Sequence, residues 1–206
     1  MKTYTISILA LLLITLFSCK PSLDKDAAVE NPQVISVFQQ SMLDEINLAR
    51  TGPAAYADLR LKTEMLNSFD NGSYLYLKNL APLSALSFKN SLNLSATNYA
   101  KFLAVNNLMG HDEDGNPLRR AIIQGFDGCS IGENIAASTG DECNSELDPK
   151  TAAINFVKLM IIDRGVSDLE HRLTLLSSGY STVGIGYSRN PSSTFVNYNV
   201  QDFGNQ

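Results

Sequence analysis

The sequence predicts an α+β fold with helices on both sides of a largely antiparallel sheet, a pattern compatible with a three-layer α-β-α sandwich. Apolar residues recur at helical spacing in three stretches: 34–48, 88–108 and 149–160. Three further stretches predict strands: 130–138, 181–189 and 194–203. The last two are joined by Asn190-Pro191-Ser192-Ser193, a turn composition that indicates an antiparallel hairpin.

The first part of the domain predicts two helices and a loop. The helix 34–48 is broken at Gly52-Pro53, and Pro53 can open a second helix that continues to residue 61. We assign Arg50 to a structural salt bridge rather than to a functional site. Within the following loop, residues 74–77 predict a short strand or an insertion.

One of the two histidines in the chain follows the long helix 88–108. Gly110 is a suitable helix stop, so His111 falls in a loop just beyond the helix, which suits a site residue better than a core residue. The acidic run 112–116 lacks the further ligands of a calcium loop and predicts a solvated turn. A short helix is expected at 118–124.

The strand 130–138 carries an acid on its apolar side. Glu133 has the same parity as Ile131, Ile135 and Ala137, so it points toward the core side of the strand. A carboxylate there must be paired or hydrogen-bonded, because burying it alone is costly. Glu133 is therefore a candidate site residue, the alternative being a salt bridge to a neighbouring arginine or a backbone cap.

The second histidine follows another predicted helix. Asp148 is expected as the N-cap of that helix and Pro149 as its first residue. Asp163 lies at its far end and either faces the same cavity as the histidines or points to water. His171 then opens a short helical segment. Imidazole titrates near neutrality and is the commonest metal ligand. Because the chain has only two histidines, general-base or metal-binding chemistry by imidazole is confined to His111 and His171.

Composition limits the partners. The 206 residues are 44% hydrophobic and 18% charged, which suits one globular domain, and we expect a monomer. The formal net charge is −5 and no Lys/Arg-rich run occurs, so we expect no nucleic-acid partner. The acidic balance also argues against direct adhesion to anionic membranes, which leaves a lipid anchor as the expected membrane contact.

The N-terminus predicts export. Lys2 precedes an apolar run of signal-peptide length, too short to span a membrane, which ends in Leu16-Phe17-Ser18-Cys19. This end resembles a bacterial lipobox, so we expect a lipoprotein signal peptide at 1–18 and lipidation of Cys19; an ordinary signal peptide is the alternative. Residues 19–33 predict a lipid anchor and tether, and 34–206 the domain itself.

Two cysteines remain, Cys129 and Cys143. An exported chain meets an oxidising compartment, so a disulfide between them is expected, closing a loop around the strand that carries Glu133. Two buried free thiols are the alternative.

The ordered motifs resemble a known family. They are a helix ending in Gly-His at 110–111, Gly-Glu-Asn-Ile-Ala at 132–136, His-Arg at 171–172, Val-Gly-Ile-Gly-Tyr at 183–187 and Gln-Asp-Phe-Gly at 201–204. The set resembles the CAP superfamily, or SCP domain, which groups cysteine-rich secretory proteins, antigen 5 and pathogenesis-related class 1 proteins. It is most similar to the bacterial, cysteine-poor branch. The resemblance implies the α-β-α sandwich.

The resemblance also implies a cleft lined by two histidines and two acids. His111, Glu133 and His171 match three of these positions, and Asp163 or Glu170 supplies the fourth. Two neutral imidazoles with carboxylates and water suit Zn²⁺ or another divalent ion, weakly bound. We therefore expect ring nitrogens of the two histidines on the order of 3–5 Å apart, because two Zn–N bonds of ~2 Å must share one ion.

Three functions remain open from the sequence. The first is a non-catalytic module of the cell envelope that binds a lipid or another small ligand, as family members do. The second is a metal-assisted hydrolase with Glu133 as the catalytic candidate. The third is a structural or interaction domain with a relic cleft. We favour the binding module.

Overall fold

The computed structural model describes residues 34–67 and 72–205, so the predicted signal peptide, Cys19 and the tether lie outside the described residues. The elements in chain order are α1 (Val37–Thr51), α2 (Pro53–Tyr56), the π-helix η1 (Ala57–Leu61), α3 (Lys62–Leu66), α4 (Ser73–Asn79), β1 (Ser87–Phe88), α5 (Asn90–Asn106), α6 (Pro117–Ile123), β2 (Ile131–Ser138), the 3₁₀-helix η2 (Asp141–Cys143), α7 (Pro149–Ile162), α8 (Glu170–Leu175), β3 (Thr182–Arg189) and β4 (Asn197–Gly204).

The described strands form one sheet in the order β1-β3-β4-β2. The hairpin β3–β4 is antiparallel, as predicted, and β2 pairs antiparallel with β4 along its whole length. The short β1 adds a two-residue parallel pairing to the first residues of β3. Because β4 is a central strand with neighbours on both sides, all eight of its residues are buried. Strand β2, which carries Glu133, is an edge strand.

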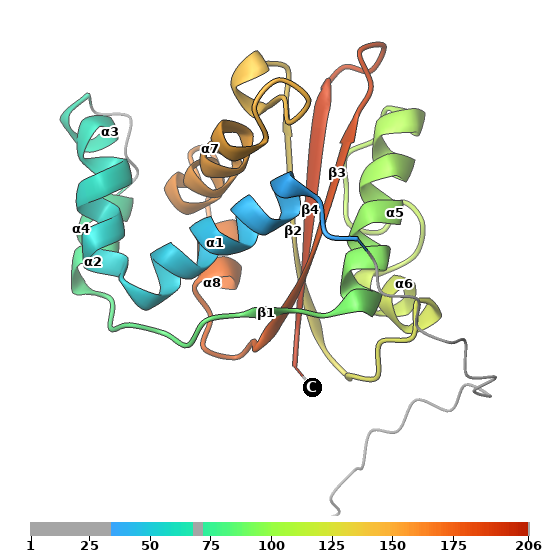
Figure 1. The fold of residues 1–206 in the computed structure, drawn as a ribbon, viewed down its shortest axis with the longest axis horizontal. Coiled ribbons are helices and arrows are strands. Elements are labelled where there is room, and N and C mark those ends of the chain that lie inside the picture. The colour runs from blue at the N-terminus through green and yellow to red at the C-terminus, as the bar shows by residue number, and fades with distance from the viewer. Residues whose placement is uncertain (1–33, 68–71, 206) are drawn as a thin grey trace, which may run out of the picture.

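Helices cover both faces of the sheet (Figure 1). Helices α1, α7 and α8 pack on one face over a core that includes Val183, Ile185 and Phe203. Helix α5 packs on the other face against Ile135, Tyr198 and Val200, with α6 beside it. The predicted α-β-α sandwich with a largely antiparallel sheet is therefore confirmed.

Helix α5 lies unusually close to the sheet because two facing residues of β3 are glycines. A Cβ built on Gly184 would lie 2.0 Å from the carbonyl carbon of Leu92, and one on Gly186 would lie 2.1 Å from the carbonyl oxygen of Ala96. Real Cβ atoms do not approach backbone this closely, so only glycine permits this contact. The helix is thereby held directly over the residues of β4 that face it.

Two local predictions were wrong. Residues 73–79 form helix α4 instead of a strand or loop, and their buried side chains, Ser73 and Leu77, are four residues apart, as in a helix. The stop of α5 is Asn107 and not Gly110. Asn107 adopts the left-handed conformation at φ 54° and its N–H reaches the carbonyl of Leu103, a role that asparagine shares with glycine.

Arg50 is buried and has no carboxylate partner among the described residues, so the predicted salt bridge was wrong. Its guanidinium donates to the backbone carbonyls of Ser84, Leu175, Ser177 and Tyr180, at 2.8–3.4 Å. These carbonyls belong to the segment before β1, to the last residue of α8 and to the segment that joins α8 to β3. Arg50 therefore ties the end of α1 to two stretches that are distant in the sequence.

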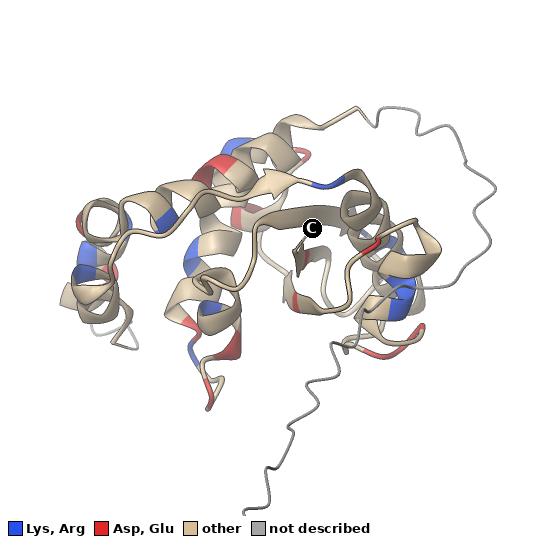
Figure 2. Ribbon diagram, turned by 90° about the horizontal axis from the view of Figure 1, so that it is seen from below, with Lys and Arg blue, Asp and Glu red and all other residues tan. Residues whose placement is uncertain are grey.

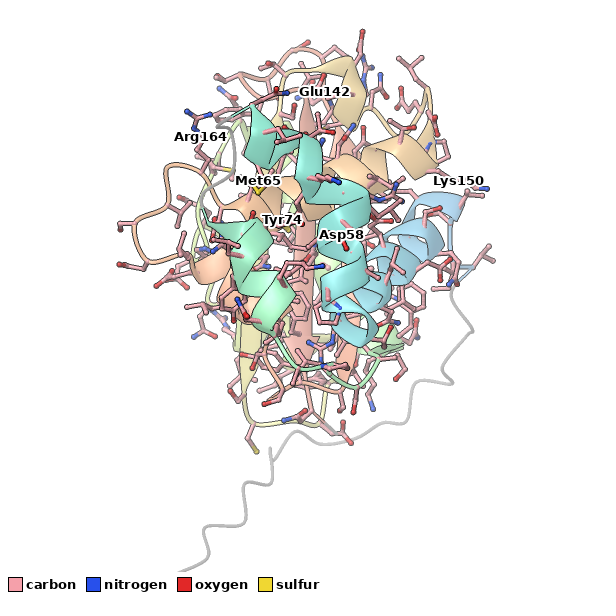
Figure 3. The ribbon with its side chains drawn as sticks, turned by 90° about the vertical axis from the view of Figure 1, so that its left-hand side faces the viewer. Asp58, Met65, Tyr74, Glu142, Lys150 and Arg164 are labelled. Carbon is pink, nitrogen blue, oxygen red and sulfur yellow. The ribbon has the colours of Figure 1, made fainter. Side chains whose placement is uncertain are left out.

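The group α2, η1, α3 and α4 stands at one side of the sandwich (Figure 3). Tyr74 of α4 points toward Asp58 of η1, and its hydroxyl donates to that carboxylate at 2.8 Å. Lys78 pairs with the second oxygen of Asp58, and Arg60 joins the group to Glu45 of α1 through two bonds. Within residues 34–67 and 72–205, none of the helices combines the length and the hydropathy that a transmembrane span requires.

Candidate functional site

The candidate site is built on two neighbouring residues of the edge strand β2. Glu133 and Asn134 are successive, so their side chains point to opposite faces of the sheet. Glu133 shares its face with Ile131 and Ile135, which pack under α5 and α6, as its parity predicts. Only 2% of the Glu133 side chain is exposed. Each face of the strand receives one of the two histidines.

Glu133 binds His111 and Arg120 at the same time. The Nδ1 atom of His111 lies 2.8 Å from Glu133 Oε1, and Arg120 of α6 donates from Nη2 to the other carboxylate oxygen. The hydrogen bond to Glu133 raises the pKa of His111, although its side chain is 49% exposed. The two alternatives for Glu133, site residue and salt bridge to an arginine, are thus combined in one arrangement.

Arg120 and Tyr99 hold the loop that carries His111. The guanidinium of Arg120 lies 3.4 Å above the centre of the Tyr99 ring and donates to the carbonyls of His111 and Gly115. The Tyr99 hydroxyl donates to the carbonyl of Gly110 at 2.6 Å. Sequence reasoning missed Arg120. The signal available was a second basic residue in the short helix after the acidic turn, at a position that faces inward.

His171 lies on the opposite face and has its own acid. Its Nδ1 atom lies 2.7 Å from Asp163 Oδ1, and its carbonyl accepts a bond from Asn134 Nδ2 at 3.0 Å. Asp163 is the left-handed C-cap of α7 at φ 55° and is only 2% exposed. Its second oxygen accepts the N–H of Arg172. Glu170 is exposed, so the acid that contacts the histidine is Asp163.

The two histidines therefore present equivalent arrangements. In each, a buried carboxylate holds Nδ1, and Nε2 makes no hydrogen bond within the part of the chain that the structure describes. A carboxylate on one ring nitrogen fixes the tautomer and leaves a lone pair on the other. No group of three or more His, Cys, Asp or Glu residues suited to a metal is found among residues 34–67 and 72–205. Each histidine thus has one ring nitrogen that could accept a ligand or an ion.

The predicted disulfide between Cys129 and Cys143 was wrong. Cys143 is a free thiol, fully buried, and burial raises its pKa to about 11. The two cysteines flank opposite ends of β2, whose eight residues span roughly 25 Å at ~3.3 Å per residue. A disulfide requires Cα atoms within about 7 Å. The strand between them keeps them apart.

A separate cavity lies at the other edge of the sheet. It has a volume of about 430 Å³ and is lined by the first turn of α1, Thr97, Pro149 and Tyr187 of β3. Strand β3 is two strands away from β2 in the sheet. The cavity is thus distinct from the histidine site.

Comparison with known proteins identifies the class and then the family. An α-β-α sandwich with two His–carboxylate pairs beside its edge strand matches the expectation for a CAP domain. Residues 43–203 match the model of the CAP family, described as the cysteine-rich secretory protein family. This match covers most of the chain, so the chain belongs to that family.

Two solved structures share the fold. An outer surface protein from Borrelia burgdorferi has a TM-score of 0.50 and 17% identity, covering 82% of this chain and 92% of that chain. The structure of BmVAL-1 has a TM-score of 0.51 and 14% identity, covering 84% of this chain and 78% of that chain. Identities this low show the shared fold alone. No curated protein gives a significant sequence match.

Proposed function

We propose that this chain is an exported ligand-binding module of the cell envelope, in which His111 and His171 hold a divalent ion, zinc being the first candidate. The observation that carries the proposal is that each imidazole has Nδ1 held by a buried carboxylate and Nε2 left open among the described residues. Both histidines are anchored to adjacent residues of β2. Two histidines leave coordination positions for a ligand.

The first test is zinc titration by calorimetry. Replacing His111 or His171 by alanine should abolish binding. The variant Glu133→Gln should weaken binding by about 10- to 100-fold, because the glutamate orients an imidazole that binds the ion. Glu113→Gln, which changes an exposed acid of the same loop, is the matched control and should bind like the wild type.

The affinity should also depend on pH. An imidazole must be neutral to bind a metal, and the raised pKa of His111 means that protons compete at a higher pH than for a free imidazole. Affinity should therefore fall as the pH drops through the titration of His111, and binding should release protons. An affinity that is independent of pH between about 5 and 8, or unchanged in either alanine variant, places the ion elsewhere.

The cavity beside α1 supports binding of a small ligand. A volume of about 430 Å³ lies within the range of small-molecule pockets, ~300–1,000 Å³, and its lining combines Phe38 and Val37 with polar groups. We infer that an envelope lipid or a similar amphiphile enters here. Native mass spectrometry of protein purified from membranes should show a bound small molecule, and Val37→Trp, which enlarges a side chain that lines the cavity, should lose it.

A metal-assisted hydrolase is the second reading of the same site. It requires a general base beside the metal. Both oxygens of Glu133 already accept hydrogen bonds, and the side chain is almost fully buried, which disfavours that role. Turnover of envelope polymers by zinc-loaded protein that is lost in Glu133→Gln would favour the hydrolase, whereas zinc binding without turnover favours the binding module. If neither zinc binding nor turnover is found, the remaining function is that of a structural or interaction domain.

Export is supported by two features. The N-terminal stretch has the composition of a lipoprotein signal peptide ending at Cys19. One protein with the same fold is described as an outer surface protein. We infer that the domain is carried on a lipid anchor and tether outside the cytoplasm.

A further inference from the structure

We propose that Asp202 is a neutral carboxylic acid that donates its hydrogen bond to Glu133 and so acts as a positioning residue of the histidine site. The first observation is its place in the sheet. Asp202 of β4 is the direct ladder partner of Glu133 of β2 and of Gly184 of β3. Directly opposed residues on one face of a sheet have Cβ atoms ~4.5–5.5 Å apart, so the two carboxyl groups are neighbours.

The second observation is that Asp202 is sealed from water. It has no exposed surface. Gly184 lets α5 lie on the sheet directly beside it, and a Cβ on Gly204, the next residue of β4 on the same face, would meet Phe126 and Leu92. Helix α5 and the residues packed with it therefore cover Asp202, and an ionised carboxylate in this position would have lost its hydration.

The third observation is that the carboxyl oxygens of Asp202 have too few donors for an ionised group. Neither oxygen makes a hydrogen bond of good geometry among the described residues. The hydroxyl of Ser95 in α5 lies close enough to donate one, which favours the ionised acid, but burial and the charge of Glu133 have larger effects in the opposite direction. An ionised carboxylate can only accept hydrogen bonds, whereas a protonated one carries a donor. Asp202 can thus be satisfied as an acid whose O–H points to Glu133.

The neighbouring charges select which carboxyl holds the proton. Glu133 accepts from His111 and Arg120, which favours its ionised form. The charged groups around Asp202 are Glu133 from β2 and Arg120 from α6, and α5 contributes Ser95. Burial raises the pKa of Asp202 well above its usual value, and the negative charge of Glu133 raises it further.

The proposed bond gives Glu133 a third donor. With His111, Arg120 and Asp202 each donating, the carboxylate is held in one orientation, and the proton of His111 is held on Nδ1. The benefit of this arrangement for metal binding rests on the proposed function. The protonation of Asp202 does not, and it is measured on metal-free protein.

The first experiment compares the unfolding equilibrium of the wild type with that of Asp202→Asn as a function of pH. The amide is neutral, has the same shape and can donate to Glu133. Between about pH 4.5 and 8 the folded wild type holds one proton that the unfolded chain has released, so its stability falls as the pH rises. The ratio of the wild-type to the variant unfolding constant should therefore increase about tenfold per pH unit. Asp44→Asn, at an exposed acid of α1, is the control and should give a constant ratio.

A ratio that is constant with pH for Asp202→Asn overturns the proposal, because it means that Asp202 is ionised in the fold. If the variant does not fold, the carboxyl ¹³C chemical shift of Asp202 in the wild type decides the question. The shift should stay at the position of a protonated acid at pH 7. A titration near the ordinary aspartate value of ~3.9 overturns the proposal.

The second experiment tests positioning by NMR titration of His111 without metal. Asp202→Asn keeps the donor and should leave the His111 pKa unchanged. Asp202→Val removes the donor, loosens Glu133 and should lower the His111 pKa toward its ordinary value. An unchanged His111 pKa in the valine variant, or an equal drop in both variants, contradicts the positioning role. Loss of zinc binding with these NMR results intact would count against the proposed function alone.

Discussion

At the scale of single residues, the site depends on the hydrogen-bond partner of each charged side chain. Glu133 holds His111 on one face of β2, and Asp163 holds His171 on the other. Arg120 and Arg50 are both buried, yet the first neutralises a carboxylate while the second binds backbone carbonyls. Arginine thus supports the candidate site in one place and connects distant chain segments in another.

Removing the Glu133 charge should change the titration of His111. Because Glu133 raises the pKa of His111 in the fold, the pair stabilises the folded state fully below the unfolded value of ~6.5, and this stabilisation is lost as the pH rises through the folded pKa. Glu133→Gln should lower the His111 pKa toward its ordinary value, as followed by NMR. Glu113→Gln should change it little. An unaltered pKa in Glu133→Gln would show that another group controls His111.

Arg50 should be one of the most sensitive positions for stability. Arg50→Met keeps much of the apolar stem but leaves four carbonyls without their donor. We expect a loss of about 3 kcal/mol or more, because hydrogen bonds to charged groups contribute ~1.5–3 kcal/mol each and are not additive. Urea unfolding measures the change.

Arg189→Met serves as the control for Arg50. Arg189 pairs at 3.4 Å with Glu146, whose side chain is 64% exposed, and such surface pairs contribute ~0–1 kcal/mol. Equal losses for the two arginine variants would contradict the carbonyl-clamp interpretation of Arg50.

At the scale of elements, the distance between α5 and the sheet controls both the core and the site. The glycines of β3 allow a helix-on-strand contact that excludes water from the face carrying Glu133 and Asp202. The polar residues Gln39 and Asn93 then satisfy the outer backbone of β3 at Ile185, through bonds of 2.7 and 2.8 Å. These side chains occupy backbone groups of β3 that lie beyond the short β1. Fewer groups on this edge of the sheet are therefore open to pairing with another chain.

A single methyl group between α5 and β3 should disturb this contact. Gly186→Ala places a Cβ 2.1 Å from the Ala96 carbonyl oxygen, so the helix must shift. We expect a loss of about 1–3 kcal/mol, typical of overpacking, and faster amide exchange in α5. Gly52→Ala, where the nearest atom is 3.7 Å away, should be tolerated. Wild-type stability in Gly186→Ala would mean that α5 does not lie as close as described.

At the scale of the whole molecule, charged residues of both signs are spread over the described elements (Figure 2). Figure 2 shows basic and acidic residues interspersed along the same helices, with a net charge of −5 for the chain. An acidic chain with mixed charges offers little electrostatic attraction to anionic polymers or lipids. The proposed lipid anchor at Cys19 would supply a membrane attachment that these charges do not.

The proposed lipid anchor can be tested directly. Cys19→Ser should release the protein from the membrane fraction or block its processing, because a serine cannot carry the lipid. Fractionation followed by immunodetection measures the distribution, with Cys143→Ser as the control for a cysteine change inside the fold. Unchanged membrane association of Cys19→Ser would remove the lipoprotein assignment and leave an ordinary signal peptide.

Several features of this protein follow from the sequence alone. The spacing of apolar residues predicts the main helices and the hairpin β3–β4, because periods of 3.6 and 2 are properties of local geometry. Asp148 and Pro149 predict the start of α7, and the structure confirms both roles. The parity of Glu133 predicts the face to which its side chain points. The ordered motifs indicate the CAP family, which the comparison confirms.

Other features exist only in the tertiary structure. The pairing of β2 with β4 brings Glu133 opposite Asp202, which lies far along the chain, and no local pattern encodes that register. The partnership of Arg120 with Glu133 and of Asp163 with His171 likewise depends on how α6 and α8 pack beside β2. Cys129 and Cys143 are close in sequence yet separated by an extended strand. Local sequence sets the direction in which a side chain points, whereas the fold sets what it meets there.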